Sequence, residues 1–182
     1  MKTHLRSPQS APQIIVKGLN ASARRGVLIV GSLRLPCALG RGGRTAAKRE
    51  GDGATPIGRF ALREVFYRPD RIARPRTGLP VRPIRPDAGW CDDPKDRNYN
   101  RPIRQPYRAS AERLWRTDAL YDLFVVIGYN DRPRILGRGS AIFMHVAGPG
   151  FAATEGCVAL RRNDLRRVLE LLTPRTRVLI SP

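Results

Sequence analysis

Two side chains of this sequence carry the chemistry that covalent acyl transfer needs. Cys157 lies within residues 154–160, directly after Gly156, and His145 ends an apolar run further upstream. A thiol becomes a good nucleophile when a neighbouring base accepts its proton, and histidine has a pKa suited to that task. We therefore predict that Cys157 is a nucleophile and that His145 is its base.

The residue before the cysteine supports this interpretation. Glycine lets the backbone turn tightly, so Gly156 and Cys157 are predicted to present two N–H groups as an oxyanion hole. The spacing alone favours a second interpretation, in which both residues are structural. A lone cysteine is commonly a small buried hydrophobic residue, and a histidine at the end of a strand is commonly structural.

The pattern around these residues predicts a mostly β protein. Sixteen prolines and 17 glycines are spread along the chain, which favours short strands and turns over a helical bundle. His145 falls in one of two apolar runs that read as buried strands. The predicted strands are 13–17, 25–30, 33–39, 58–67, 123–128, 141–146 and 177–180.

One or two short helices are expected beside the strands. Ser110 is a plausible N-cap for a helix over residues 110–115. Asn163 is the expected cap of a second helix, which Pro174 ends. Its apolar face has helical spacing and consists of Leu165, Val168, Leu169 and Leu172. Residues 68–107 are dense in proline, arginine and aspartate, and are predicted to be irregular.

The length of 182 residues fits one domain, expected over residues 13–182 after a disordered lead-in at 1–12. No apolar stretch is long enough to span a membrane. The first 13 residues are not followed by the apolar segment of a signal peptide. The sequence by itself is thus compatible with a cytoplasmic protein or with an export signal that this chain lacks.

A formal net charge of +19 predicts attraction to anionic partners. A nucleic-acid-binding protein is therefore one alternative. However, no nucleic-acid-binding motif is present, and aromatic residues, which stack on bases, make up only 7% of the chain. We do not expect a nucleic-acid partner.

The remaining candidate sites are weak. Cys37 and Cys91 could pair as a disulfide only if the fold brings them close. No Cys-x-x-Cys or paired histidine motif indicates a metal site, and a solvated loop is the preferred interpretation of Asp92, Asp93 and Asp96. Residues 51–53 lack the lysine of a phosphate-binding loop and are read as a β-turn.

His145, the core Thr154-Glu155-Gly156-Cys157-Val158 and the helix after it resemble the YkuD-type L,D-transpeptidase catalytic domain family. Residues 51–60 are similar to the Thr-Pro-x-Gly-x-Phe segment of that family. The resemblance runs from about residue 13 to residue 180. It implies a β-sandwich-like fold, Cys157 as nucleophile and His145 as base.

The chain departs from the family pattern near the thiol. Glu155 stands where the family usually has histidine before Gly-Cys, and the spacer from the upstream histidine is shorter. The polar residue often found two places after the cysteine is Ala159 here, and Arg161 or Arg162 is the expected substitute. The Cys/His pair is kept, while contacts to the substrate near the thiol are expected to differ.

The resemblance implies an L,D-transpeptidase that acts on peptidoglycan stem peptides through a Cys157 thioester. It further implies a protein of the cell envelope or periplasm that needs no metal or organic cofactor and is acylated by carbapenems. We expect a monomer. Hydrolysis by an L,D-carboxypeptidase or endopeptidase, or cell-wall binding without turnover, are the alternatives. The expected substrate-binding residues are Thr154, Glu155, Tyr99 and Arg101.

Overall fold

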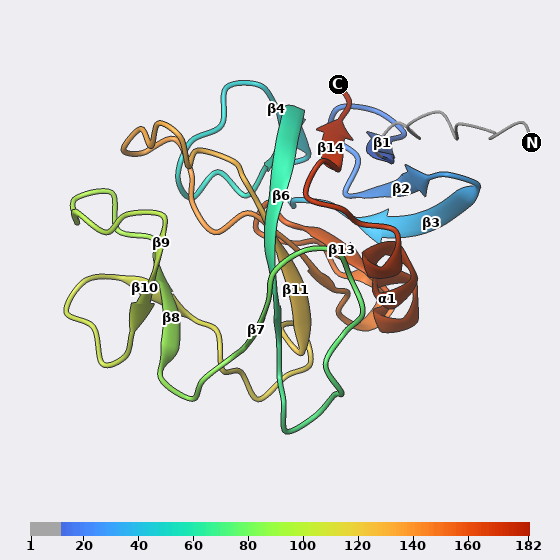
Figure 1. Cartoon of the computed structure of the whole chain (residues 1–182). Helices are drawn as coiled ribbons and strands as arrows, with labels where there is room; N and C mark the ends of the chain where they lie inside the picture. The colour runs from blue at the N-terminus through green and yellow to red at the C-terminus, as the bar shows by residue number, and fades with distance from the viewer. Residues whose placement is uncertain (1–11) are drawn as a thin grey trace, which may run out of the picture.

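The computed structural model describes residues 12–182, and these form a mostly β protein (Figure 1). Among them there is one α-helix, α1 (Arg162–Glu170), and one short 3₁₀ turn at Pro149–Phe151. The mostly β fold with a short helix is therefore confirmed. The predicted disordered lead-in covers residues 1–12, of which 1–11 lie outside the described residues.

Nine strands form the main sheet, in the order β11-β12-β13-β3-β2-β1-β14-β6-β7. Because β6 also pairs with β11, this sheet closes on itself, with β7 added at its margin. The bounds are β1 (Gln13–Gly18), β2 (Arg25–Val30), β3 (Leu33–Ala38), β6 (Gly58–Tyr67), β7 (Val81–Pro83), β11 (Leu123–Ile127), β12 (Phe143–Val146), β13 (Val158–Leu160) and β14 (Arg177–Ile180). A two-residue pair, β4 (Arg44–Thr45) and β5 (Thr55–Pro56), lies outside it.

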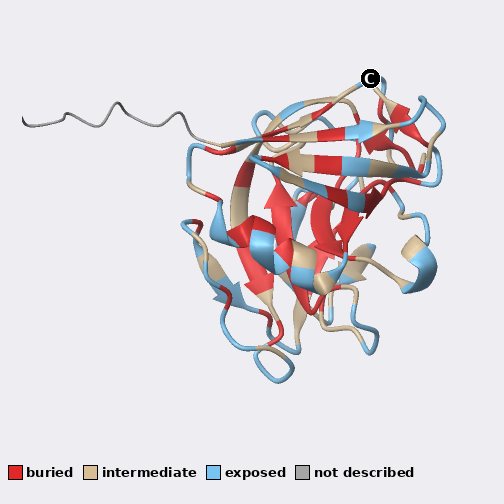
Figure 2. Cartoon of the chain, turned by 90° about the vertical axis from the view of Figure 1, so that its right-hand side faces the viewer, coloured by how far each residue is buried: buried red, intermediate tan, exposed pale blue. Residues whose placement is uncertain are grey.

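The sheet buries apolar side chains on both of its faces (Figure 2). Side chains alternate between the faces of a strand, so odd and even positions of β11 and β12 enter different clusters. Leu123, Val125 and Met144 join the larger cluster, which includes the apolar face of α1. Phe124 and Phe143 join a smaller aromatic cluster that also contains Cys157. The candidate nucleophile thus lies on the aromatic face of the sheet.

Helix α1 follows β13 and buries Leu165, Val168 and Leu169, as its periodicity predicts. The expected cap is wrong by two residues, because Arg161 is the N-cap and Asn163 lies in the first turn. No side chain caps this end. The apolar face, rather than a capping residue, therefore places the helix start.

A second, three-stranded sheet covers part of the aromatic face, in the order β10-β8-β9. Its strands are β8 (Ala88–Cys91), β9 (Arg101–Arg104) and β10 (Ala111–Arg113). The predicted helix at residues 110–115 is wrong, because Ala111 to Arg113 pair with Cys91 to Gly89 of β8. Cross-strand pairing and burial of Leu114 outweigh the helix propensity of this short segment.

The other cysteines do not form the disulfide that was considered. Cys37 and Cys91 are buried, free thiols, as is Cys157. Burial raises the pKa of Cys37 to about 12, so this thiol is protonated at neutral pH. Within residues 12–182 no helix has the length and apolar character that crossing a bilayer requires.

Candidate active site

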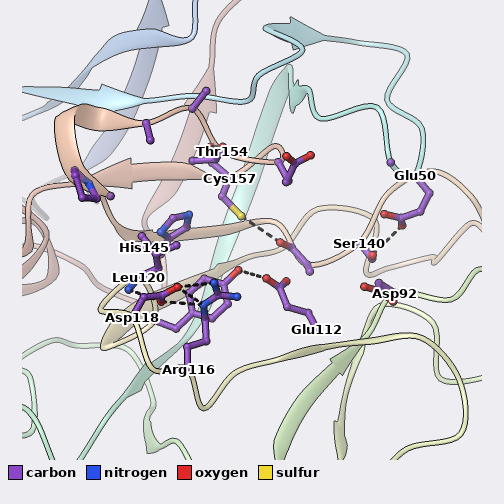
Figure 3. Close-up of a pocket in the computed structure, with 18 residues that line it drawn as sticks. Glu50, Asp92, Glu112, Arg116, Asp118, Leu120, Ser140, His145, Thr154 and Cys157 are labelled. Atoms are coloured by element: carbon purple, nitrogen blue, oxygen red, sulfur yellow. Dashed lines mark hydrogen bonds and ion pairs between the residues drawn. The ribbon is translucent and has the colours of Figure 1, made fainter.

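Cys157 and His145 are brought together by two neighbouring strands. His145 lies on β12, and Cys157 directly precedes β13, which pairs with β12 in parallel. The register sets Met144 beside Val158 and His145 beside Ala159. Since alternate residues share a face, His145 and Cys157 both lie on the aromatic side of the sheet. Figure 3 shows the two side chains in one cleft.

The cleft has a volume of about 590 Å³. It is built from the loop before β5, the second sheet, the segment before β11, and the connection from β12 to β13. Its wall carries five carboxylates and one guanidinium, although the chain as a whole is strongly basic. The charged lining residues are Glu50, Asp92, Glu112, Asp118, Glu155 and Arg116. The cleft is therefore an acidic site in a basic protein.

The Cys157 thiol is held by the backbone of the segment that enters β12. It donates to the Ala141 carbonyl at 3.3 Å (Figure 3), and it accepts the Phe143 N–H at 3.3 Å. Burial raises the pKa of Cys157 to about 12, with a further rise from the Glu112 carboxylate. The resting site thus contains a thiol and not a thiolate.

His145 is buried and held in one tautomer. Its Nδ1 lies 2.8 Å from the Val146 carbonyl oxygen. Because a carbonyl only accepts, Nδ1 carries the proton and Nε2 keeps a free lone pair. Burial lowers the pKa of His145 to about 4. The imidazole is therefore neutral at pH 7, in the form that a general base requires.

The turn that presents Cys157 depends on Thr154 and Gly156. The Thr154 hydroxyl donates to the Cys157 carbonyl at 2.7 Å and accepts the Gly156 N–H at 3.2 Å. Gly156 has φ +126°, and a Cβ there would meet the Ala54 carbonyl oxygen at 2.8 Å. Thr154 lines the cleft as expected, but its hydroxyl is engaged within the turn.

Glu155 lies at the exposed edge of the cleft. Its carboxylate receives both of its contacts from Arg41 Nε, at 2.8 and 2.9 Å. Both side chains are more than half exposed. His145 is bonded instead to Val146, so Glu155 makes no hydrogen bond to the imidazole in the described chain. Burial outweighs the Val146 hydrogen bond and the Asp118 carboxylate, which favour the imidazolium form, so the pKa of His145 is lowered without a contribution from Glu155.

Two predicted substrate-binding residues lie outside the cleft. Tyr99 is buried and donates its hydroxyl to Glu50 at 2.5 Å, while Ser140 donates to the same carboxylate at 2.8 Å. Arg101 is an exposed residue of β9 and does not line the cleft. The structure thus places both residues away from the cleft lining: Tyr99 anchors a wall residue, and Arg101 faces solvent.

The arginines after the cysteine also lie away from the cleft lining. Arg162 pairs with the buried carboxylate of Asp122 at 2.5 Å. Arg161 lies over the ring of Phe151 at 5.4 Å. Neither residue takes the place of a polar group two positions after Cys157.

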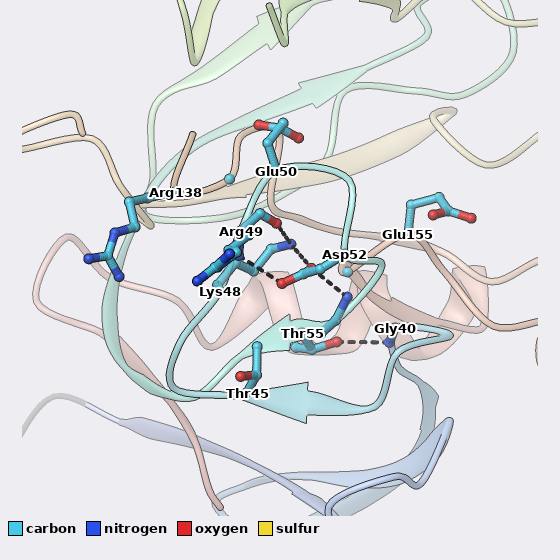
Figure 4. Close-up of polar contacts among 12 residues, drawn as sticks. Gly40, Thr45, Lys48, Arg49, Glu50, Asp52, Thr55, Arg138 and Glu155 are labelled. Atoms are coloured by element: carbon cyan, nitrogen blue, oxygen red, sulfur yellow. Dashed lines mark hydrogen bonds and ion pairs between the residues drawn. The ribbon is translucent and has the colours of Figure 1, made fainter. Parts of the chain in front are cut away.

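The loop that carries Glu50 is braced by Asp52 (Figure 4). The Asp52 carboxylate accepts hydrogen bonds from Lys48 Nζ at 2.5 Å and from the Arg49 and Ala54 N–H groups at 2.8 Å. The segment predicted as a turn is thus a turn with its own internal support. It places Glu50 and Gly51 at the cleft wall.

Three residues of the cleft have no signal in the sequence that would reveal them. Glu112 lies in the segment predicted to be helical, Arg116 follows directly after that segment, and Tyr121 precedes the buried strand β11. Tyr121 donates its hydroxyl to Glu112 at 2.5 Å. Burial raises the pKa of Glu112, although this hydrogen bond acts in the opposite direction. Only the folded chain brings these residues to Cys157.

Metal ligation is not supported by the residues that the structure describes. Among residues 12–182 no group of three histidine, cysteine, aspartate or glutamate side chains is arranged to hold a metal ion. Asp96, one of the three neighbouring aspartates, instead accepts the Tyr107 hydroxyl at 2.9 Å and the Asn98 N–H at 2.7 Å. This carboxylate has a structural role in the loop.

Comparison with known proteins gives one match. The family model YkuD, described as the L,D-transpeptidase catalytic domain, matches residues 21–180 of the 182-residue chain. The matched region includes both Cys157 and His145, and it ends with β14. No curated protein and no solved structure matched the chain.

Proposed function

Because the chain belongs to the YkuD family of L,D-transpeptidase catalytic domains, we propose that it transfers acyl groups of peptidoglycan stem peptides through a thioester on Cys157. The observation that carries the proposal is the shared cleft of Cys157 and His145 on adjacent parallel strands. Residues 13–182 act as one catalytic domain, as a monomer in the cell envelope. No step requires a metal or an organic cofactor.

In the first step Cys157 attacks the substrate carbonyl, and Nε2 of His145 accepts the thiol proton. The pKa of the thiol is raised and that of the imidazole is lowered, so the neutral pair is favoured at rest. The thiol proton therefore leaves as sulfur attacks the carbonyl carbon. Sulfur forms the thioester, and the imidazolium returns its proton to the departing amine.

Developing charge on the carbonyl oxygen needs N–H donors. The Cys157 N–H has no hydrogen-bond partner within residues 12–182 and is the first candidate. The Gly156 N–H makes only a 3.2 Å contact to the Thr154 hydroxyl, which a negatively charged oxygen can replace. These two donors make up the proposed oxyanion hole.

The charge of the cleft favours an amine acceptor over water. Five carboxylates line it against one guanidinium, and Asp92 Oδ1 is buried without a hydrogen-bond partner. Such a wall attracts an ammonium group and repels phosphate. It therefore supports transpeptidation over hydrolysis, and it disfavours a nucleic acid as occupant of the cleft.

Purified stem peptides test the proposal. Incubation with a tetrapeptide donor and an amine-bearing acceptor should give a cross-linked product and a transient thioester on the Cys157 peptide. A carbapenem should likewise leave a stoichiometric adduct on Cys157. Mass spectrometry detects each species. Release of hydrolysed donor alone would favour a carboxypeptidase, and failure of both acylations with a folded protein would exclude the enzyme.

Glu155 offers a test of acceptor binding at the cleft edge. We expect Glu155→Gln to raise the KM for the amine acceptor by about 3- to 10-fold, because one carboxylate near the ammonium is lost. Alkylation of Cys157 and the melting temperature should stay unchanged, since exposed ion pairs contribute little to stability. Initial rates at varied acceptor concentration provide the measurement.

Glu64→Gln is the matched control for this change. Glu64 forms an ion pair with Arg82 at 2.6 Å and lies outside the cleft. Its replacement should leave the acceptor KM at the wild-type value. A faster or slower alkylation of Cys157 in Glu155→Gln, with no change in KM, would instead assign Glu155 to the thiol.

A further inference from the structure

Tyr121 is buried against the candidate base. Its ring meets the His145 ring edge to face, with centroids 5.4 Å apart and an interplanar angle of 83°. The other sides of Tyr121 contact Phe124 at 5.3 Å and Phe143 at 5.8 Å. The Arg116 guanidinium lies 5.4 Å from the centre of the ring. Tyr121 is thus fixed by packing and forms one wall of the space that His145 occupies.

The hydroxyl of Tyr121 is tied to a different part of the fold. It donates to Glu112 Oε1 at 2.5 Å, and Glu112 belongs to β10 of the second sheet. Arg116 is itself held by Asp118 through contacts of 2.9 and 2.6 Å (Figure 3). The sheet that covers the cleft is therefore linked to His145 through Glu112 and Tyr121.

The hydrogen bond to Val146 does not by itself fix the orientation of the His145 ring. It sets the tautomer, but the final torsion of a histidine side chain has broad minima. A packed neighbour is needed to keep Nε2 at a fixed place beside the thiol. Tyr121 is the aromatic ring that packs on His145 in the described chain.

We propose that Tyr121, anchored by Glu112, is a positioning residue that holds the imidazole of His145 in its reactive orientation. This inference rests on the proposed function for its kinetic consequence, but the geometry can be tested without turnover. Tyr121 acts through its ring on His145, and Glu112 acts through the Tyr121 hydroxyl.

Four single replacements separate these contributions. Tyr121→Leu removes the ring, while Tyr121→Phe removes only the hydroxyl. Glu112→Ala removes the acceptor of that hydroxyl, and Glu112→Gln keeps an oxygen that can accept it. Tyr129→Phe is the matched control, because Tyr129 also contacts a ring edge to face (Phe60, 5.5 Å) and donates a 2.5 Å hydrogen bond, but outside the cleft.

The kinetic readout is the acylation of Cys157 by a stem peptide or a carbapenem. We expect Tyr121→Leu to lower its maximal rate about 100-fold, and Tyr121→Phe and Glu112→Ala about 10-fold each, with half-saturation unchanged. The Tyr121→Phe, Glu112→Ala double variant should be no slower than either single variant, because both remove one hydrogen bond. Glu112→Gln should restore a rate close to wild type.

The second readout is the pH titration of the His145 ring signal by NMR. The signal is assigned by its absence from the spectrum of His145→Gln. In the wild type the imidazole should stay neutral until the pH falls to its pKa of about 4. Tyr121→Leu should move this pKa toward the ordinary value of about 6.5, because water reaches the ring. Tyr129→Phe should change neither readout.

Defined results would overturn the proposal. The first is a His145 pKa that stays at the wild-type value in a folded Tyr121→Leu variant. The second is a double variant in which the two losses of acylation rate add. The third is a change in the half-saturating concentration without a change in the maximal rate. If Tyr121→Leu does not fold, the Tyr121→Phe and Glu112 variants decide the question alone. If the wild type is never acylated, the proposed function fails, while the His145 titration still judges the role of Tyr121.

Discussion

Cys157→Ala is expected to lower turnover of stem peptides by at least about 10⁴-fold, because removing the nucleophile of a covalent mechanism leaves only binding and the oxyanion donors. The fold should persist, since alanine fits the site of a small buried side chain. Product formation by mass spectrometry measures the loss, and thermal unfolding measures the stability. The thioester and the carbapenem adduct should disappear together.

The other two cysteines provide matched controls. Cys37 and Cys91 are also buried and free, but neither lines the cleft. Cys37→Ala and Cys91→Ala should retain most of the wild-type activity when assayed well below their melting temperatures. Wild-type turnover by Cys157→Ala would refute the assignment of the nucleophile.

His145→Gln is expected to lower acylation by about 10³-fold at pH 7 while making the protein less sensitive to acid. Burial lowers the pKa of His145 from 6.5 to about 4 in the folded chain. Between these values the unfolded chain binds a proton that the folded chain rejects. Wild-type stability therefore falls as the pH drops from 6.5 to about 4, by on the order of 3 kcal/mol from this residue.

Urea unfolding at pH 7.5 and pH 4.5 checks the stability part of this prediction. The pKa values of Asp52 and Asp118 are lowered from 3.8 in the folded chain, so these carboxylates titrate below this pH range, and they are present in both proteins. His145→Gln should be the less stable protein at pH 7.5, and its difference from the wild type in free energy of unfolding should be smaller at pH 4.5. An equal difference in free energy of unfolding at both pH values would show that His145 has an ordinary pKa in the folded state.

Regular strands of this protein follow directly from their residue patterns. The predicted strands at residues 25–30 and 58–67 coincide with β2 and β6, and those at 123–128 and 141–146 contain β11 and β12. In β11 every residue is buried, so an apolar run without gaps was a sufficient signal. Helix α1 was equally visible, because its buried residues recur with helical spacing.

The segment between β6 and β11 was not predictable in the same way. Residues 68–107 contain three short strands, and their pairing depends on partners that are distant in sequence. The helix expected at residues 110–115 is a strand for the same reason: Glu112 pairs with Trp90. Local propensity is a weak guide where a segment of three residues is held by its neighbours.

The residues of the candidate site also fall into those that the sequence predicts and those that it does not. Cys157, His145, Gly156, Thr154 and Glu155 all line the cleft or shape its turn, and a short motif with one upstream histidine was enough to find them. The burial of Tyr99 behind the cleft wall was not predictable, because an aromatic residue in an irregular loop gives no indication of burial. Glu112 and Tyr121 were missed because their proximity to His145 exists only after two sheets pack together.

The parallel pairing of β12 with β13 has a consequence for how insertions and deletions act on this site. Parallel strands need a crossover, here the residues between Val146 and Val158 with the turn at Pro149–Phe151. Residues added at that turn lengthen the crossover and reshape the cleft edge, yet leave the register intact. A single residue deleted from β13 (Val158–Leu160) moves Cys157 to the opposite face relative to the residues that follow, and sends the thiol into the larger core. The number of residues between His145 and Cys157 can therefore change, whereas both side chains must stay on the same face of the sheet.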